Sequence, residues 1–281
     1  MTSDPRSLER ELRARPDDGV VNLAGYSTVD TPGVSDEDDA NDELEASFRP
    51  RLYDLHDRLM AEEQRSVLLV LQGLDASGKG GTIKHVVIAM NPSGVSTASF
   101  VAPTEEEAEQ HFLERIRVRV PEPGQLGVFD RSHYEDVIVP LALRNEDETV
   151  IDQRIDEINE FESELTDGGT TIVKCLLHVS FEEQRERFLR RLRRDDKRWK
   201  FSEDDLDTRT HWDEFQAAYG NVLARTSPEH APWYVIPADH KWYRNWAVGS
   251  LLVHTLESLA LAYPQPRFDI ESLRARLEPP N

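Results

Sequence analysis

Apolar and amphipathic stretches alternate along most of the chain. Residues 66–72 form a near-continuous apolar run, which is typical of a parallel strand buried on both faces. Residues 41–63 carry leucine and phenylalanine at helical spacing, which predicts an amphipathic helix that leads into the core. The same patterns predict further strands over 95–101, 126–130, 170–179 and 233–237, and further helices from near 78 and over 104–118, 150–165, 181–194, 204–223 and 242–261. Repeated strand–helix units imply an α/β fold with a mostly parallel sheet covered by helices on both faces.

The two ends of the chain differ from this pattern. Residues 1–45 are rich in Asp, Glu, Pro and Gly, so we expect an acidic N-terminal extension that is flexible or loosely docked. Residues 46–265 are predicted to form one domain, and residues 266–281 a C-terminal tail. The sequence shows no internal repeat and no clear second domain.

A glycine-rich segment follows the first predicted strand. Residues 73–80, GLDASGKG, fit the pattern G-x-x-x-x-G-K between a strand and a helix, which is the context that a P-loop needs. Glycines let the backbone bend around a phosphate, and the following helix presents free N–H groups and the positive end of its dipole. Lys79 would add a mobile charge for the phosphoryl oxygens. The alternative is a chance glycine-rich turn. The predicted phosphate- or nucleotide-binding residues are Gly73, Ala76, Ser77, Gly78, Gly80, Gly81 and Thr82.

The segment departs from the usual P-loop in one position. Gly80 stands where a Ser or Thr commonly binds magnesium, while Asp75 lies inside the loop. A carboxylate among phosphates is repulsive unless a metal or a proton lies between them. We therefore predict that Asp75 is a Mg²⁺ ligand or orients the attacking phosphate oxygen. A simple turn-forming aspartate is the alternative.

A second acidic residue ends an apolar strand. Asp130 closes the run 126–130, and the carboxyl end of a parallel strand faces the crevice where ligands bind. This is the Walker-B position, which predicts a second Mg²⁺ ligand. The adjacent Arg131 could hold a phosphate with two hydrogen bonds. The neighbouring His133 and Tyr134 are interpreted as structural.

Charge changes the picture in two ways. The chain carries 54 acidic and 33 basic residues, for a formal net charge of -21. Such a lysine-poor, acidic surface favours a protein adapted to concentrated salt, although an ordinary acidic enzyme is the alternative. No apolar run is long enough to cross a bilayer, no secretory signal is visible, and the single Cys175 excludes an internal disulfide framework. We therefore expect a soluble cytoplasmic protein.

The second effect of charge is local. Basic residues cluster within the acidic chain from the end of the helix predicted over 181–194 onward, which favours a lid over residues 190–205 that closes on phosphates and excludes water. A solvated helix face with ordinary salt bridges is the alternative, and the overall acidity argues against nucleic acid as a partner. The predicted lid and polyphosphate-channel cations are Arg190, Arg191, Arg194, Lys197, Arg198, Lys200 and, on the P-loop helix, Lys84.

These segments together resemble the polyphosphate kinase 2 family over about residues 52–261. The resemblance is carried, in order, by residues 73–84, 91–94, 102–107, 129–137, 199–202, 230–239 and 241–245. It implies a P-loop kinase-like, three-layer α/β/α fold with a helical lid. It also implies that Asp75 is tied to metal and to the accepting nucleotide, that Lys79 is the P-loop lysine, and that Asp130 and Arg131 are the Walker-B pair. Residues 132–137 resemble the branch that accepts nucleoside monophosphates and diphosphates, a branch that often carries Asn where this chain has Asp130.

The resemblance implies a reaction and its partners. The expected activity is reversible, Mg²⁺-dependent phosphoryl transfer from inorganic polyphosphate to AMP or ADP, giving ADP or ATP. The family also implies a homo-oligomer, either a dimer or a tetramer. The alternatives are an ATP-dependent nucleotide kinase, whose P-loop would look alike, and a non-catalytic sensor of nucleotide or polyphosphate.

Overall fold

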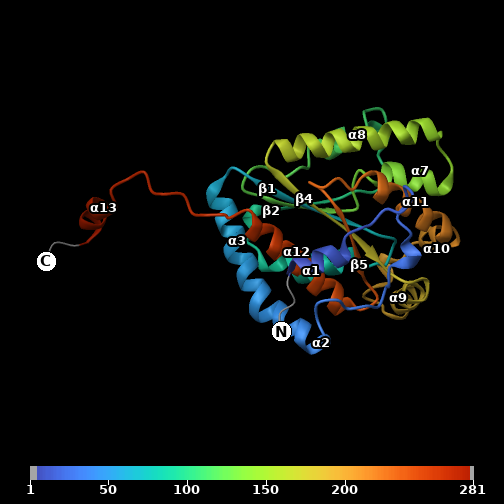
Figure 1. Ribbon diagram of the computed structural model, residues 1–281, viewed down its shortest axis with the longest axis horizontal. Helices are drawn as coiled ribbons and strands as arrows, with labels where there is room; N and C mark the ends of the chain where they lie inside the picture. The colour runs from blue at the N-terminus through green and yellow to red at the C-terminus, as the bar shows by residue number, and fades with distance from the viewer. Residues whose placement is uncertain (1–4, 279–281) are drawn as a thin grey trace.

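The computed structural model describes residues 5–278, and its described residues contain one five-stranded, fully parallel sheet (Figure 1). The strand order is β2-β3-β1-β4-β5. The strands are β1 (Ser66–Gln72), β2 (Val95–Ser99), β3 (Leu126–Asp130), β4 (Thr170–His178) and β5 (Trp233–Pro237). All the predicted strands are confirmed, with ends that agree to within two residues.

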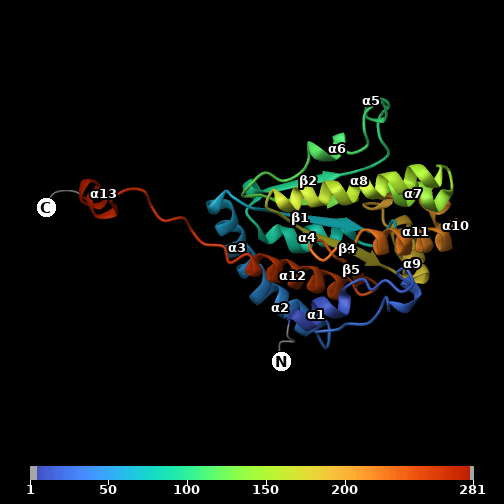
Figure 2. The same cartoon turned by 45° about the horizontal axis from the view of Figure 1, so that its top comes forward.

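The described α-helices cover both faces of this sheet, except for the last one, which lies away from it (Figure 1). They are α1 (Pro5–Leu12), α2 (Glu37–Glu43), α3 (Arg49–Glu62), α4 (Lys79–Val86), α5 (Glu105–Ala108), α6 (Glu114–Arg117), α7 (Glu135–Leu143), α8 (Glu148–Asp167), α9 (Phe181–Arg193), α10 (Asp204–Thr210), α11 (Trp212–Arg225), α12 (Lys241–Ser258) and α13 (Ile270–Leu277). In Figure 2, α7 and α8 lie on one side of the sheet, and α1 and α12 lie on the other. The α/β fold predicted from the alternating pattern is therefore confirmed.

The central strand explains why two helical layers are needed. Every residue of β1 is buried, and its side chains alternate between two apolar clusters. Val67, Leu69 and Leu71 pack with residues of α1, α3, α4 and α12. Leu68 and Val70 pack with residues of α7, α8 and α11. A strand that is apolar on both faces cannot be left open to water on either side, so the sequence of β1 by itself requires both layers.

The register of the strands gathers the polar loops at one edge. Leu71 of β1 lies opposite Asp130 of β3, and both strands end there. Because the strands are parallel, the P-loop (residues 73–80) and Arg131 leave the sheet at the same edge. The carboxyl ends of parallel strands are where ligands bind in folds of this kind.

The expectation of a loosely docked N-terminal extension is wrong for the described residues 5–45. Leu8 and Leu12 of α1 are buried in one core cluster, and Val21 and Leu23 are buried in the other. Backbone hydrogen bonds also tie this segment to the domain, because Ala14 N donates to the carbonyl oxygen of Trp233 at 2.8 Å. The acidic composition obscured the few apolar residues that anchor the segment, since burial depends on those residues and not on the mean polarity.

Two predicted helices are divided in the structure, and a third is confirmed. The stretch 41–63 lies in one continuous helical run formed by α2, a π-helical turn over Leu44–Phe48, and α3. The stretch 104–118 forms only the short helices α5 and α6. The capping box of Thr104 and Glu107 begins α5, but α5 buries no side chain whose packing could stabilise a longer helix. The stretch 204–223 is broken at His211 into α10 and α11.

The C-terminal segment leaves the body of the molecule. Figures 1 and 2 both show the chain after α12 extending away from the sheet and ending in α13. The apolar side chains of Phe268, Ile270 and Leu277 are exposed along it. Within residues 5–278, no helix combines the length and the apolar character needed to cross a membrane.

Candidate phosphate-binding site

The P-loop connects β1 to α4 through an unusual backbone path. Gly73 and Gly78 have φ angles of 142° and 118°, and Ala76 has φ of 64°. At Gly78 an added Cβ would lie 1.8 Å from Nη1 of Arg244, so only glycine fits there. The prediction that a helix starts near residue 78 is confirmed, because α4 begins at Lys79. The predicted loop residues from Gly73 to Thr82 therefore lie together at the N-terminus of α4.

Side chains from inside and outside the loop satisfy its carbonyl groups. Lys79 is buried, and its Nζ donates to the carbonyl oxygens of Gly73 at 2.6 Å and Leu74 at 3.5 Å. Thr82 is also buried, and its hydroxyl donates to Gly78 O at 3.4 Å. Within the part of the chain that the structure describes, the N–H groups of Ala76 and Gly78 have no protein acceptor. Free N–H groups at a helix N-terminus form an anion-binding site.

Asp75 and Arg131 meet across this loop. Nη2 of Arg131 lies 2.5 Å from Oδ1 of Asp75, and both side chains are about a quarter exposed. Burial disfavours the charged carboxylate, but the charges of Lys79 and Arg131 outweigh it and hold the pKa of Asp75 below its ordinary value. Arg131 has a left-handed backbone, with φ of 62°. A non-glycine residue held in this conformation is a frequent feature of functional sites.

A further carboxylate adjoins the pair. Glu135, in the first turn of α7, interacts electrostatically with Arg131, Lys79 and Asp75. Burial raises the pKa of the Glu135 carboxyl, although the two cations favour its charged form. Asp75 and Glu135 therefore have their pKa values moved in opposite directions at one site, which is a common property of sites that manage charge during a reaction.

The predicted metal ligands lie at the carboxyl ends of adjacent strands, Asp75 in the loop after β1 and Asp130 at the end of β3. Asp130 is the last residue of β3 and is partly exposed, and its carbonyl accepts a hydrogen bond from Phe100 N at 3.1 Å. Among the described residues, no group of three or more His, Cys, Asp or Glu side chains forms a ready-made metal cage. Mg²⁺ in phosphoryl-transfer sites is held by one or two carboxylates together with substrate phosphates and water. The pair of Asp75 and Asp130 fits that kind of site.

The predicted lid, residues 190–205, runs from the last turn of α9 to the first residues of α10, and its cations differ in their partners. Nη1 of Arg191 donates to Lys200 O at 3.1 Å and lies 3.5 Å from Asp205, and the charge of Arg191 helps to lower the pKa of Asp75. The other lid cations are more exposed and pair locally. These pairs are Arg190 with Glu183, Arg194 and Lys197 with Asp196, and Arg198 with Asp195. Lys84 is exposed on α4.

A family model described as Polyphosphate kinase 2 matches residues 34–263. The chain belongs to the polyphosphate kinase 2 family. It is 46% identical over 264 residues to an AMP/ADP-polyphosphate phosphotransferase of Meiothermus ruber, covering 94% of this chain and 98% of the relative. It is 40% identical over 227 residues to an ADP-polyphosphate phosphotransferase of Rhodopseudomonas palustris, covering 76% of this chain and 78% of that one.

A solved structure supports the same assignment. The crystal structure of polyphosphate kinase 2 from Arthrobacter aurescens TC1 superposes with a TM-score of 0.92 at 41% identity, covering 98% of this chain and 97% of that chain. The fold of this chain is therefore that of a polyphosphate kinase 2, and the P-loop kinase-like architecture implied by the resemblance is confirmed.

The structure adds three polar residues that the pattern of the sequence did not single out. Gln184 and Arg187 of α9 contact the P-loop backbone, and Arg244 of α12 lies against Gly78 and Gly81. Arg244 is buried without a carboxylate partner among the described residues, and burial together with the charge of Arg187 lowers the pKa of its guanidinium. Arg244 lies in the segment 241–245 that carries the family resemblance, but no local pattern shows that these side chains are buried or which acceptors they reach.

The residues interpreted as structural do lie in the core. His133 and Tyr134 are fully buried, and both contact the carboxylate of Glu162, which also pairs with Lys174. Lys174 further donates to Tyr134 Oη at 3.0 Å and to Thr226 O at 2.7 Å. Each charge in this cluster has a partner, as burial in a low-dielectric interior requires.

Proposed function

We propose that this member of the polyphosphate kinase 2 family transfers phosphoryl groups between inorganic polyphosphate and AMP or ADP. The observation that carries the proposal is an anion-binding P-loop with Lys79 and the Asp75–Arg131 pair, in a chain 46% identical to a relative named AMP/ADP-polyphosphate phosphotransferase. The relative named as an ADP-polyphosphate phosphotransferase supports the same donor. The reaction is expected to be reversible.

The proposed mechanism relies on positioning and charge. A terminal phosphate oxygen of the nucleotide attacks the end phosphorus of the polymer, the bond to the next bridging oxygen breaks, and the shortened polymer leaves with that oxygen. Loop N–H groups and Lys79 bind the phosphoryl oxygens, while Arg131 and Arg191 neutralise the charge that spreads over them. Lys84 and the lid residues Arg190, Arg194, Lys197, Arg198 and Lys200 are proposed to bind the polymer.

The proposed cofactor is Mg²⁺, held by Asp75 and Asp130. When bound, the ion would supply positive charge that offsets the negative charge of the phosphate oxygens. Asp75 would hold the metal, and Arg131, which pairs with Asp75 in this structure, would bind phosphate. Removal of divalent ions with EDTA should abolish turnover, and added Mg²⁺ should restore it.

The deciding experiment is an assay with polyphosphate and Mg²⁺ but no ATP, in which AMP and ADP are compared as acceptors. Formation of ADP or ATP supports the proposal. No product with either acceptor, together with transfer from ATP to AMP, would identify an ATP-dependent nucleotide kinase. Tight binding of polyphosphate or nucleotide without turnover by either route would identify a sensor. Lys79→Ala and Asp130→Ala should remove turnover while the thermal unfolding transition persists.

We also propose that the protein is a cytoplasmic homo-oligomer, a dimer or a tetramer. The exposed apolar side chains on the extended C-terminal segment are available to contact another copy. Light scattering should give two or four times the chain mass of 32.2 kDa. A mass of a single chain at micromolar concentration would contradict this assembly.

A further inference from the structure

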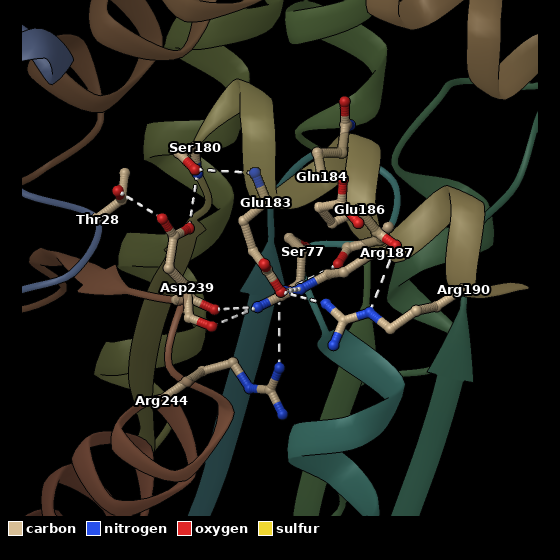
Figure 3. Close-up of polar contacts among 12 residues, drawn as sticks. Thr28, Ser77, Ser180, Glu183, Gln184, Glu186, Arg187, Arg190, Asp239 and Arg244 are labelled. Carbon is tan, nitrogen blue, oxygen red and sulfur yellow. Dashed lines mark hydrogen bonds and ion pairs between the residues drawn. The ribbon is translucent and has the colours of Figure 1, made fainter.

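Helix α9 begins against the end of β5. Ser180 caps the helix by accepting a hydrogen bond from Glu183 N at 3.1 Å, and Ser180 N donates to Oδ1 of Asp239 at 2.8 Å. The other oxygen of Asp239 accepts from the hydroxyl of Thr28 at 2.9 Å (Figure 3). The first turn of α9 is therefore fixed to the domain, while its last turn leads into the lid.

One turn further along α9, all three nitrogens of the Arg187 guanidinium donate hydrogen bonds beside the P-loop. It is 6% exposed, and its Nε donates to Glu183 at 2.8 Å. Nη1 donates to the carbonyl oxygens of Ala76 at 2.9 Å and Ser77 at 2.7 Å. Nη2 donates to the carbonyl oxygens of Ala238 at 2.5 Å and Asp239 at 3.0 Å. Figure 3 shows the guanidinium between the P-loop and the segment that follows β5.

Gln184 makes a second connection from the same helix. It is 1% exposed, and its Nε2 donates to the carbonyl oxygen of Asp75 at 2.9 Å. Its Oε1 accepts from Nη1 of Arg209 in α10 at 2.9 Å. Because α9 and α10 flank the lid, Gln184 joins the P-loop to both helices from which the lid is suspended.

These contacts determine which way the loop amides face. The bonds from α9 hold three successive carbonyls, those of Asp75, Ala76 and Ser77. In a planar trans peptide the N–H group points opposite to the carbonyl, so the N–H groups of Ala76 and Gly78 point away from α9. Neither of these two N–H groups has a protein acceptor among the described residues. Ala76 has a left-handed backbone, which is strained for a residue other than glycine, so the hydrogen bonds from α9 stabilise this part of the loop most.

We propose that Arg187 and Gln184 are positioning residues that couple the P-loop to the lid. They hold the loop carbonyls so that the amides stay oriented toward a phosphate. They also link the conformation of the loop to the positions of α9 and α10. The proposal rests on the phosphoryl transfer proposed above. It also makes a prediction about loop dynamics that does not depend on turnover.

The test compares conservative variants in the full-length chain. Arg187→Lys keeps the charge but cannot reach carbonyls on two sides, since an ammonium lacks the planar fork of five donors. Gln184→Glu keeps the acceptor for Arg209 and removes the donor to Asp75 O. Arg185→Lys is the matched control, because Arg185 is on the same helix but is exposed and pairs with Glu182 and Glu186.

Hydrogen exchange and steady-state kinetics provide the two readouts. We expect faster exchange of the amides of Ser77, Gly81 and Thr82, which donate to loop carbonyl oxygens, in both Arg187→Lys and Gln184→Glu, and a fall in kcat of about tenfold or more with a smaller change in the nucleotide KM. Adding guanidinium ion to Arg187→Ala should restore part of kcat. Arg185→Lys should leave exchange and kcat unchanged.

The outcomes separate this proposal from the proposed function. If both variants match Arg185→Lys in loop exchange, the positioning role is overturned, whether or not the protein is active. A kcat loss fully accounted for by the unfolded fraction, measured by thermal unfolding, also overturns it. If the wild type transfers no phosphate, the function fails, and the exchange comparison alone decides the coupling. Should Arg187→Lys not fold, Gln184→Glu supplies both readouts.

Discussion

At the scale of single residues, the site is a set of charges whose balance can be measured. Asp75 is surrounded by Lys79, Arg131 and Arg191, and their charges hold its pKa below the ordinary value in spite of burial. Glu135, in the same site, has its pKa raised by burial. The two carboxyl groups have the same chemistry, so the difference comes from where the fold places them.

The low pKa of Asp75 predicts how a variant behaves with pH. Its stabilisation is fully present above the ordinary aspartate pKa of about 3.9 and is lost as pH falls through the lower folded value. Asp75→Asn should therefore lower the free energy of unfolding by about 1 kcal/mol at pH 7, a value discounted for the partial exposure of the pair. Urea unfolding of both proteins from pH 7 downward should show this difference shrinking toward acid. A difference that grows toward acid would contradict the assignment.

The glycines of the loop give a second prediction. Gly78→Ala forces a positive φ on alanine and places Cβ 1.8 Å from Arg244 Nη1, so this buried guanidinium must move. We expect a loss of about 2 to 4 kcal/mol in the free energy of unfolding. Gly80→Ala is the matched control, since no atom lies within 4 Å of its added Cβ. It should change stability by less than about 0.5 kcal/mol. Equal losses in the two variants would show that neither the space beside Gly78 nor its positive φ is decisive, since alanine by itself favours a helix more than glycine does.

At the scale of elements, the helices that flank the lid and the lid itself make different kinds of contact. Helix α9 is anchored at its start by Ser180 and inserts Arg187 under the P-loop, whereas most lid cations pair with acidic residues nearby. The sequence predicted both the helix and the cationic segment. It did not distinguish the buried arginines from the exposed ones, because adjacent helical positions differ in burial only once the helix is packed.

The lid gives a prediction about which cation matters for the reaction. Arg191 is about a quarter exposed and its charge acts on Asp75, so Arg191→Ala should lower kcat by about tenfold to a hundredfold. Arg185→Ala removes an arginine from the exposed side of the same helix and should change kcat by less than about twofold. Steady-state assays with polyphosphate and ADP make the comparison. Similar losses in both variants would favour a general effect of net charge.

At the scale of the whole molecule, the most unusual property is charge. The formal net charge is -21, and yet the proposed donor is a polyanion. Local cations near the P-loop and the lid are therefore needed to bring the polymer to an otherwise repulsive surface. We propose, from composition alone, that the acidic surface is an adaptation to high salt.

Salt dependence tests that proposal. Near 1 M salt the Debye length is about 3 Å, so self-repulsion of the acidic surface is screened, while the buried P-loop contacts are screened much less. We expect activity to hold or rise from physiological salt toward molar KCl. The thermal unfolding temperature should rise over the same range. Loss of both activity and thermal stability with added KCl would indicate an ordinary acidic enzyme.

The sequence by itself determined the layers of the fold and the position of the glycine-rich loop. The apolar run of β1 required helices on both faces, and the spacing of Gly73, Gly78 and Lys79 predicted a P-loop, in which both glycines have the positive φ that glycine tolerates. These features are local: each depends on the periodicity or the backbone freedom of a few adjacent residues.

The tertiary structure decided what distant residues do to one another. It buried Leu8 and Leu12 of an acidic segment, broke the helix predicted over 104–118, and brought Arg187 and Arg244 to the loop from positions more than a hundred residues away in the chain. Such contacts depend on how whole elements pack, which no local pattern encodes. The P-loop was therefore recognisable from its own residues, while the side chains that hold its carbonyls became visible only in the folded protein.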